Sequence, residues 1–102
     1  MLERITDRAI TRDSKDSMGY EPTYSGVTSF LRRRYTKDLT GVDVAVSGVS
    51  LDTATTNRPG ARFGPRAIRD ASGQLRAHHW DPARLEPPYD RLRIIDYGDL
   101  DV

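Results

Sequence analysis

Two apolar runs along the chain have the character of β-strands, and a segment between them has that of a helix. The first run, residues 42–49, is rich in valine, which is typical of a strand covered on both faces in a parallel sheet. The second run lies in residues 91–102, with its apolar part at Leu92, Ile94 and Ile95. With the helix between them, the two strands predict a βαβ unit and therefore an α/β fold.

The predicted helix follows a loop rich in Gly, Pro and Arg over residues 52–64. Pro65 suits the first helical position, because its missing N–H costs nothing there, and Gly64 is then expected as the N-cap. The apolar residues that follow share one side of a helix: Ala67, Ile68 and Ala71. Ser72 and Gly73 are expected to bring the helix towards its end.

The chain before the first strand is more polar. Residues 1–23 predict a flexible N-terminal arm. Residues 25–35 predict a short amphipathic helical segment, because their apolar members recur at roughly helical spacing: Val27, Phe30, Leu31 and Tyr35. The arginines at 32–34 form either an anion-binding patch or a solvated face beside the apolar stripe, and the second interpretation is favoured.

Composition narrows the class of protein. Only 36% of the 102 residues are hydrophobic and 30% are charged, which leaves little material for a core. Two parallel strands and one helix cannot cover both faces of a sheet, so we expect part of a larger α/β domain. The net charge of +1 gives no indication of nucleic acid or membrane partners, and no stretch approaches the roughly 20 apolar residues that span a bilayer. The lack of cysteine excludes disulfides and thiolate ligands and fits a cytoplasmic protein.

The loop before the helix carries the first candidate chemistry. Arg58, Arg62 and Arg66 surround a predicted helix N-terminus, which attracts anions through its free N–H groups and its dipole. A phosphate-binding loop over residues 57–64 is therefore one interpretation, although the GxxxxGK[ST] and GxGxxG patterns are absent. The favoured interpretation is that these arginines pair with carboxylates and hold the loop.

The second candidate is the acidic end of the second strand. Asp96, Asp99 and Asp101 could bind a hard divalent cation. Alternation along a strand places Asp99 and Asp101 on one face and Asp96 on the other, unless Gly98 bends the chain. A carboxylate that stabilises a neighbouring loop or caps a helix is the competing interpretation, and it is favoured.

The two histidines of the chain, His78 and His79, are adjacent and lie beside Trp80. Adjacent residues rarely converge on one metal from a regular element, and the His-x₃-His spacing of a helical metal site is absent. A packing role for this loop is favoured over a metal-binding one.

These residues resemble the ureohydrolase (arginase/agmatinase) family, and within it the agmatinase-like branch. The resemblance rests on GVSLDTATTNRPGARFGPRAIRDAS at residues 48–72, with HHWDP at 78–82 and LRIIDYGDLDV at 92–102. The segment at 24–49 is also similar to the lead-in of bacterial members. The string NRPGxRFGPxAIR is the most specific part.

The resemblance implies a three-layer α/β/α domain with a mostly parallel sheet, of which residues 24–102 would be the N-terminal part. It also implies trimers or hexamers and a binuclear manganese site. In the family, a hydroxide bridging the two Mn²⁺ ions attacks the guanidinium carbon of the substrate and releases urea and an amine, because paired cations lower the pKa of bound water. Agmatine, converted to putrescine, is the default guanidino substrate.

The family's metal ligands lie in GGDH, DAHxD and SxDxDxxDP motifs, and none of these occurs in residues 1–102. No catalytic or metal-binding residue is therefore carried over, and we expect the chain alone to be inactive. The resemblance places the loop residues at the rim of the active site or at a subunit contact: Asp52, Asn57, Arg58 and Arg62. The alternatives are a non-catalytic partner of a full-length homologue and an anion-binding module.

Overall fold

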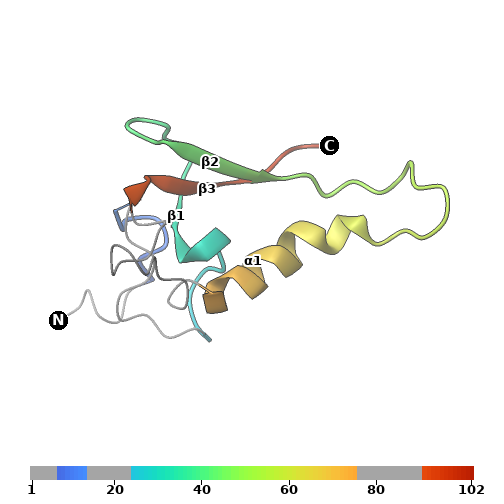
Figure 1. The fold of residues 1–102 in the computed structure, drawn as a ribbon, viewed down its shortest axis with the longest axis horizontal. Coiled ribbons are helices and arrows are strands. Elements are labelled where there is room, and N and C mark those ends of the chain that lie inside the picture. The colour runs from blue at the N-terminus through green and yellow to red at the C-terminus, as the bar shows by residue number, and fades with distance from the viewer. Residues whose placement is uncertain (1–6, 14–23, 76–90) are drawn as a thin grey trace, which may run out of the picture.

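The structure is a computed structural model, and it describes residues 7–13, 24–75 and 91–102. Within these ranges the chain forms a small parallel sheet with one long helix beside it (Figure 1). A loop leaves the end of one strand, extends well beyond the sheet and returns as the helix. The predicted His78–His79–Trp80 loop lies outside the described residues.

Three parallel strands pair in the order β1-β3-β2. They are β1 (Arg34–Tyr35), β2 (Val44–Gly48) and β3 (Ile94–Asp99). The central strand β3 contributes Ile94 and Ile95, two of the four buried hydrophobic side chains in the described ranges. The predicted parallel pairing of the two apolar runs is confirmed.

The segment over residues 25–35 is not the amphipathic helix that its spacing predicts. It contains a single 3₁₀ turn, η2 (Phe30–Arg32), and then extends into β1. Leu31 and Arg32 have φ angles of 53° and 54°, in the left-handed region, which interrupts any regular helix. The backbone N–H groups of Phe30 and Leu31 donate to side chains from distant parts of the chain, so tertiary contacts replace the helical hydrogen bonds.

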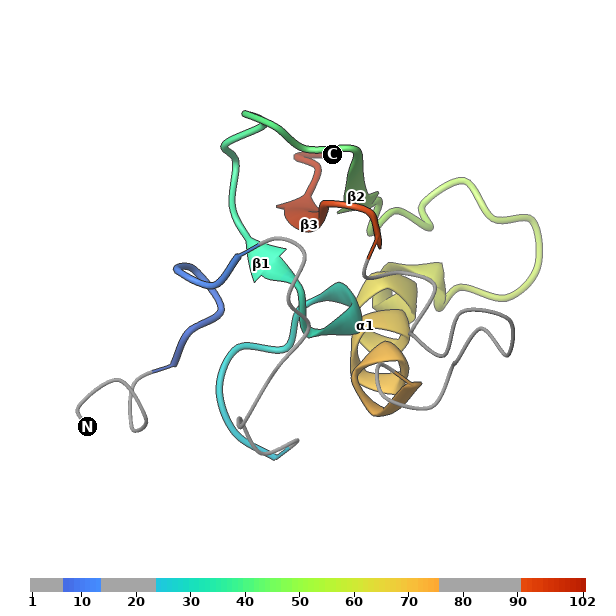
Figure 2. The same ribbon diagram turned by 60° about the vertical axis from the view of Figure 1, so that its left-hand side comes forward.

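The helix α1 (Gly64–Leu75) follows a second 3₁₀ turn, η3 (Ala61–Phe63). Gly64 already has helical angles, with φ −59° and ψ −52°, so the prediction of Gly64 as N-cap is wrong and the helix begins one residue earlier than predicted. The helix also continues past Ser72 and Gly73 to Leu75. Figure 2 shows η2 lying between β1 and α1, and α1 contacts this turn.

The apolar side of α1 is exposed in the described part of the chain. Ile68 is 59% exposed, and Ala67 and Ala71 are exposed as well. The inward side instead carries Arg69 and Ser72. The three residues thus share one side of the helix, as predicted, and the ion pairs of the helix to β3 come from Arg69.

The strand β2 is at the edge of the sheet in the described part of the chain, because it pairs with β3 alone. Val44 is 39% exposed and Ala45 is exposed. The expectation that this valine-rich strand is covered on both faces is therefore not met by the described residues.

Part of the predicted arm contacts the sheet. Ala9 is buried, and its carbonyl accepts a hydrogen bond of 2.7 Å from the N–H of Tyr35 in β1. The buried Arg12 donates to the carbonyl of Arg32. Residues 7–13 thus lie against β1 and the η2 turn, and the remainder of the arm lies outside the described residues. Among the helices that the structure describes, none has the length and apolar character to cross a membrane.

Candidate functional site

The carboxylate of Asp96 is the centre of the polar core. It is fully buried in β3, and it accepts hydrogen bonds from the backbone N–H of Phe30 at 2.8 Å and of Gly98 at 2.9 Å. Arg69 on α1 donates to both of its oxygens, from Nε at 2.7 Å and from Nη2 at 3.1 Å. The Asp96 side chain thereby joins the central strand, the η2 turn and the helix.

Arg69 completes the cluster by reaching a second carboxylate. Its Nη1 lies 2.7 Å from Oδ1 of Asp99, so the guanidinium bridges the two acids, and its own side chain is only 13% exposed. The hydrogen bonds that Arg69 donates to Asp96, and then the one to Asp99, raise the pKa of Arg69 above its ordinary value although burial opposes this. The cluster is therefore a charge-assisted pin, which we call the Arg69 pin: Arg69, Asp96 and Asp99.

A bulge in β3 brings Asp99 to the same side as Asp96. Val46 pairs with Asp96, but the next residue, Ser47, pairs with Gly98, so Tyr97 is an extra residue on β3. Gly98 has a φ of +83°, a conformation that glycine adopts without strain. The simple alternation that separates Asp96 from Asp99 is thus wrong here, and the bend at Gly98 that the sequence left open is confirmed.

The acidic residues of β3 do not fit a binuclear metal site. Asp96 is occupied by three donor groups and Asp99 by Arg69. In residues 7–13, 24–75 and 91–102, no group of three His, Cys, Asp or Glu side chains could hold a metal ion. The interpretation of these carboxylates as structural groups agrees with the geometry, and we derive no catalytic step through manganese in this part of the chain.

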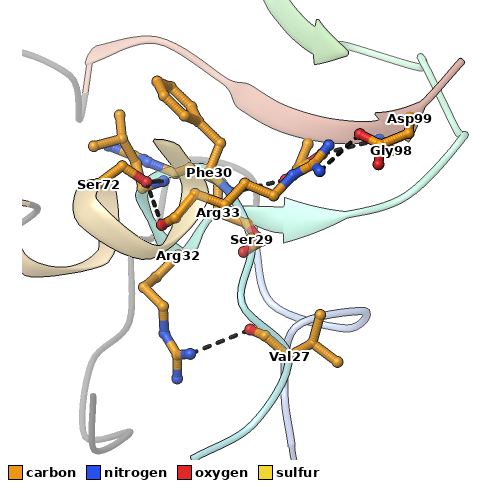
Figure 3. A network of polar contacts seen from close by, with 11 residues as sticks. Val27, Ser29, Phe30, Arg32, Arg33, Ser72, Gly98 and Asp99 are labelled. Carbon is orange, nitrogen blue, oxygen red and sulfur yellow. Dashed lines mark hydrogen bonds and ion pairs between the residues drawn. The ribbon is translucent and has the colours of Figure 1, made fainter. Parts of the chain in front are cut away.

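The turn η2 is also held by polar contacts. Ser72 Oγ accepts the N–H of Leu31 at 2.8 Å and donates to the carbonyl of Arg69, which ties the turn to the helix (Figure 3). The side chain of Ser29 donates to the carbonyl of Arg33 at 2.6 Å. These hydrogen bonds satisfy backbone groups in a segment that has no regular secondary structure.

The arginines that follow Leu31 are not a solvated face. Arg32 and Arg33 are buried, at 3% and 2% exposed. Arg32 donates to the carbonyls of Val27 at 3.2 Å and Ser25 at 2.8 Å, so it closes the chain upstream of the turn. Both the solvated-face interpretation and the surface anion patch are wrong for these two residues.

The loop after β2 is closed by a latch between Asp52 and Arg62. The buried carboxylate of Asp52 accepts the N–H of Gly60 at 2.8 Å and of Arg62 at 3.3 Å. The Arg62 guanidinium binds the same carboxylate, with Nη2 to Oδ1 at 2.8 Å. The side-chain hydrogen bonds from Arg62, followed by the backbone ones, lower the pKa of Asp52 to about 2.

The tip of the latched loop is open to solvent. Asn57 and Arg58 are exposed, as is Arg66 on α1. The structure thus divides the arginines of the candidate anion site: Arg62 is engaged by Asp52, as the favoured pairing interpretation has it, whereas Arg58 and Arg66 make no ion pair within the described ranges. The assignment of Asp52, Asn57, Arg58 and Arg62 to an active-site rim or a subunit contact stays a prediction.

Gly48, at the end of β2, is required by close packing. A Cβ atom added there would meet Asp99 Oδ1 and would lie 2.6 Å from Cβ of Pro65. Only glycine allows the end of β2, the Arg69 pin and the first turn of α1 to approach this closely. The first glycine of the family-like string thus acts in packing.

Sequence reasoning did not find Arg69 or Ser72. Arg69 is separated from Asp96 by 27 residues, and Leu31 is separated from Ser72 by 41. Neither residue belongs to a short spacing motif, so no local signal could have identified the contacts. The one available hint was Asp96 itself, an acidic residue directly after the apolar pair Ile94 and Ile95 of a predicted strand, because a buried carboxylate requires a partner.

Known proteins are similar to this chain over most of its length. Residues 42–102 match the model of the Arginase family. The chain belongs to the arginase family. It is 50% identical over 99 residues to an agmatinase of Chromobacterium violaceum, a match that covers 91% of this chain and 29% of that protein. It is also 44% identical over 77 residues to the mitochondrial guanidino acid hydrolase of Homo sapiens, covering 76% of this chain and 21% of that protein.

A solved structure supports the arginase-like fold directly. The crystal structure of a hypothetical agmatinase from Burkholderia thailandensis is similar with a TM-score of 0.78 and 53% identity, over 94% of this chain and 30% of that one. The open parallel sheet with its helix is therefore part of an arginase-like α/β fold, as predicted. This chain spans less than a third of the length of the arginase-family proteins named here.

Proposed function

We propose that this chain forms the N-terminal portion of an agmatinase-like ureohydrolase, which hydrolyses a guanidino compound to urea and an amine. The observation that carries the proposal is the 50% identity to an agmatinase over 91% of the chain. Another arginase-family relative is a guanidinopropionase of Pseudomonas aeruginosa, 40% identical over 82 residues. Agmatine is the default substrate because agmatinases stand among the most similar proteins.

In this proposal the chain supplies scaffold and surroundings, and the chemistry belongs to residues that it does not contain. The family resemblance implies two manganese ions, whereas the carboxylates of the Arg69 pin are occupied by protein donors. The latched loop follows the carboxyl end of β2, the edge at which α/β proteins bind ligands. It therefore contributes either to the rim of the active site or to a contact between the subunits of a trimer or hexamer.

The first experiment compares the native product with the isolated chain. An antibody against residues 24–75 captures the product from its own cells, its intact mass is compared with 11.5 kDa, and urea release is measured with manganese and agmatine or guanidinopropionate. We expect a larger product that releases urea, and no release by the purified 102-residue chain. A captured product that releases urea from no guanidino compound would contradict the proposal.

A substitution at the exposed tip of the latched loop can distinguish a role at the active-site rim from a role at a subunit contact. If the tip lines the rim, Arg58→Ala changes KM for the guanidino substrate and leaves the oligomeric mass of the active product unchanged. If the tip lies at a subunit contact, the same variant lowers the oligomeric mass. Arg66→Ala, which alters another exposed arginine outside the loop, is the matched control.

A further inference from the structure

A cavity of about 660 Å³ lies between α1 and the carboxyl ends of two strands. Its strand residues are Tyr35, the last residue of β1, and Asp99, the last residue of β3. Its helix residues lie on α1 between Arg66 and Asp70. The carboxyl edge of a parallel sheet is where α/β proteins bind ligands, and small-molecule sites commonly have volumes of about 300–1,000 Å³. The cavity therefore has the position and the size of a ligand site.

One wall of this cavity is apolar and partly aromatic. Phe63 and Val27 line it and are 64% and 40% exposed, so a bound molecule that covers them gains free energy. Tyr35 lines it as well, beside the bulge of β3. A Cβ atom added at Gly98 would lie only 2.9 Å from the hydroxyl oxygen of Tyr35. The glycine that bends β3 thus leaves the room in which this side chain lies.

Four charged side chains line the cavity, and two of them are already paired. Arg69 and Asp99 bind one another in the Arg69 pin. Arg66 and Asp70 are exposed, and within the described residues neither side chain makes an ion pair or a hydrogen bond. On a helix, a base four residues before an acid is the less favourable order for an ion pair between the two. The cavity thus presents one positive and one negative group to a ligand.

A ligand with a single charge fits this pair of groups poorly. An anion bound at Arg66 would be repelled by the nearby carboxylate of Asp70, and a cation bound at Asp70 would be repelled by Arg66. A zwitterion satisfies both groups, because its carboxylate accepts hydrogen bonds from the guanidinium and its ammonium group donates to the carboxylate. The Cβ atoms of helix residues four apart lie about 5–6 Å from one another, and an α-amino acid carries both of its charged groups on one carbon atom.

We propose that this cavity, here called the α1 pocket, binds a free α-amino acid with an aromatic side chain. Arg66 holds the carboxylate of the amino acid, and Asp70 holds its ammonium group. The aromatic side chain lies against Phe63 and Tyr35, because pairs of aromatic rings attract one another beyond the burial of their area. The α1 pocket is formed by five of the described residues above all: Val27, Tyr35, Phe63, Arg66 and Asp70.

The test titrates the 102-residue chain with L-tryptophan and with two analogues that each lack one charged group. Tryptamine has no carboxylate, and indole-3-propionate has no ammonium group. In isothermal titration calorimetry we expect L-tryptophan to bind with a Kd of about 1 mM or tighter, and each analogue to bind at least about threefold more weakly. An L-tryptophan titration that shows no saturation below about 10 mM would overturn the inference, as would analogues that bind as tightly as the amino acid.

Two variants assign the charged groups of the ligand to the two side chains. Arg66→Gln should weaken the binding of L-tryptophan and of indole-3-propionate, and it should leave the Kd of tryptamine unchanged. Asp70→Asn should weaken L-tryptophan and tryptamine, and it should leave the Kd of indole-3-propionate unchanged. Arg58→Gln and Asp101→Asn make the same changes at exposed positions that do not line the pocket, and they should alter each Kd by less than about twofold.

A third variant examines the aromatic wall. Phe63→Ala should weaken all three ligands to a similar extent, because they share the indole ring. Each variant must keep the circular dichroism spectrum of the parent chain. If Arg66→Gln and Asp70→Asn weaken all three ligands alike, or if Phe63→Ala leaves L-tryptophan binding unchanged, the assignment of these residues to the pocket is overturned. Calorimetry needs no urea release, so an amino acid that binds to a product without hydrolase activity would contradict the proposed function alone.

Discussion

The two sides of helix α1 are the reverse of what an amphipathic helix ordinarily shows. The side that meets the sheet and the η2 turn carries Arg69 and Ser72, whose polar groups are satisfied by Asp96, Asp99 and Leu31. The outer side carries Ile68, which is exposed beside an apolar groove. Charge-assisted hydrogen bonds thus join α1 to β3, while apolar surface of the helix stays exposed on its other side.

This contrast separates internal stability from assembly. A buried ion pair is weak evidence for net stability, but breaking it by removing one partner leaves an uncompensated buried charge. An exposed apolar side chain costs the isolated chain little and gains free energy only when it is covered. Substitutions that break the contacts of the inner side of α1 should therefore lower the free energy of unfolding, whereas substitutions on the exposed outer side should change it little.

The largest loss of stability is expected from Asp96→Ala, which removes the carboxylate that Arg69 on the inner side of α1 binds. It leaves Arg69 without its main partner and the N–H groups of Phe30 and Gly98 without an acceptor. We expect a loss of about 3–5 kcal/mol in the free energy of unfolding, measured by urea denaturation. Asp101→Ala, at an exposed position outside the pin, is the control and should change stability by less than about 0.5 kcal/mol. Equal effects of the two variants would refute the role of the pin.

A smaller loss of stability is expected from Gly48→Ala, which adds a methyl group where the end of β2 meets the first turn of α1. The added methyl group would meet Asp99 Oδ1 and Pro65, and overpacking of this kind costs about 1–3 kcal/mol. Gly64→Ala is the matched control, because no atom lies within 4 Å of its added Cβ and its φ is −59°. The control should be neutral or slightly stabilising in the same denaturation experiment. A Gly48→Ala chain as stable as the parent would show that the close approach is not required.

The latch between Asp52 and Arg62 lies away from the inner side of α1, and its stability should depend on pH. The folded pKa of Asp52, about 2, lies below its ordinary value of 3.8, so the latch is fully formed above pH 4 and opens as the pH falls towards 2. Exchange of the Gly60 amide, corrected for its intrinsic pH dependence, should accelerate over that range. Arg62→Ala should accelerate it at pH 7, and Arg58→Ala, at the exposed tip, should not. Protection unchanged by Arg62→Ala would contradict the latch.

The smallest effect is expected where a charge meets an aromatic ring near the surface. The Nζ of Lys37 lies 4.2 Å from the centre of the Tyr97 ring, on the bulge residue of β3. Exposed contacts of this kind contribute about 0.5–1 kcal/mol. Lys37→Met should therefore lower the free energy of unfolding by at most that amount, and Lys37→Arg should retain most of it. A loss as large as that of Asp96→Ala would mean that Lys37 has a structural role beyond this contact.

Sequence reasoning recovered the parts of the fold that local pattern determines. The valine run and the Ile94–Ile95 pair predicted β2 and β3 and their parallel pairing, and the Gly-Pro start predicted α1. The η2 turn and β1 were missed, because the backbone N–H groups of Phe30 and Leu31 bond to partners 66 and 41 residues away. Local helical spacing contains no information about such contacts.

The candidate site, like the fold, was predicted only where its contacts are local in sequence. The pairing of a loop arginine with a carboxylate was predicted, and Arg62 with Asp52 is such a pair within one short loop. The Arg69 pin was not predicted, because it needs a bulge at Tyr97, a bend at Gly98 and a partner on another element. The burial of Arg32 and Arg33 was missed for a similar reason: their charge predicts exposure, whereas Arg32 bonds to nearby carbonyls.

The placement of Asp96 has a consequence for how the chain emerges during synthesis. Its carboxylate gathers the N–H of Phe30 and the guanidinium of Arg69, residues made long before it. A ribosome releases a chain from its N-terminus, and contacts distant in sequence form last. Until β3 has left the exit tunnel, Arg69 on the helix has neither Asp96 nor Asp99 to bind, and its guanidinium stays in water. Of the described strands, β3 is thus the one whose synthesis allows the η2 turn and α1 to be joined through Asp96.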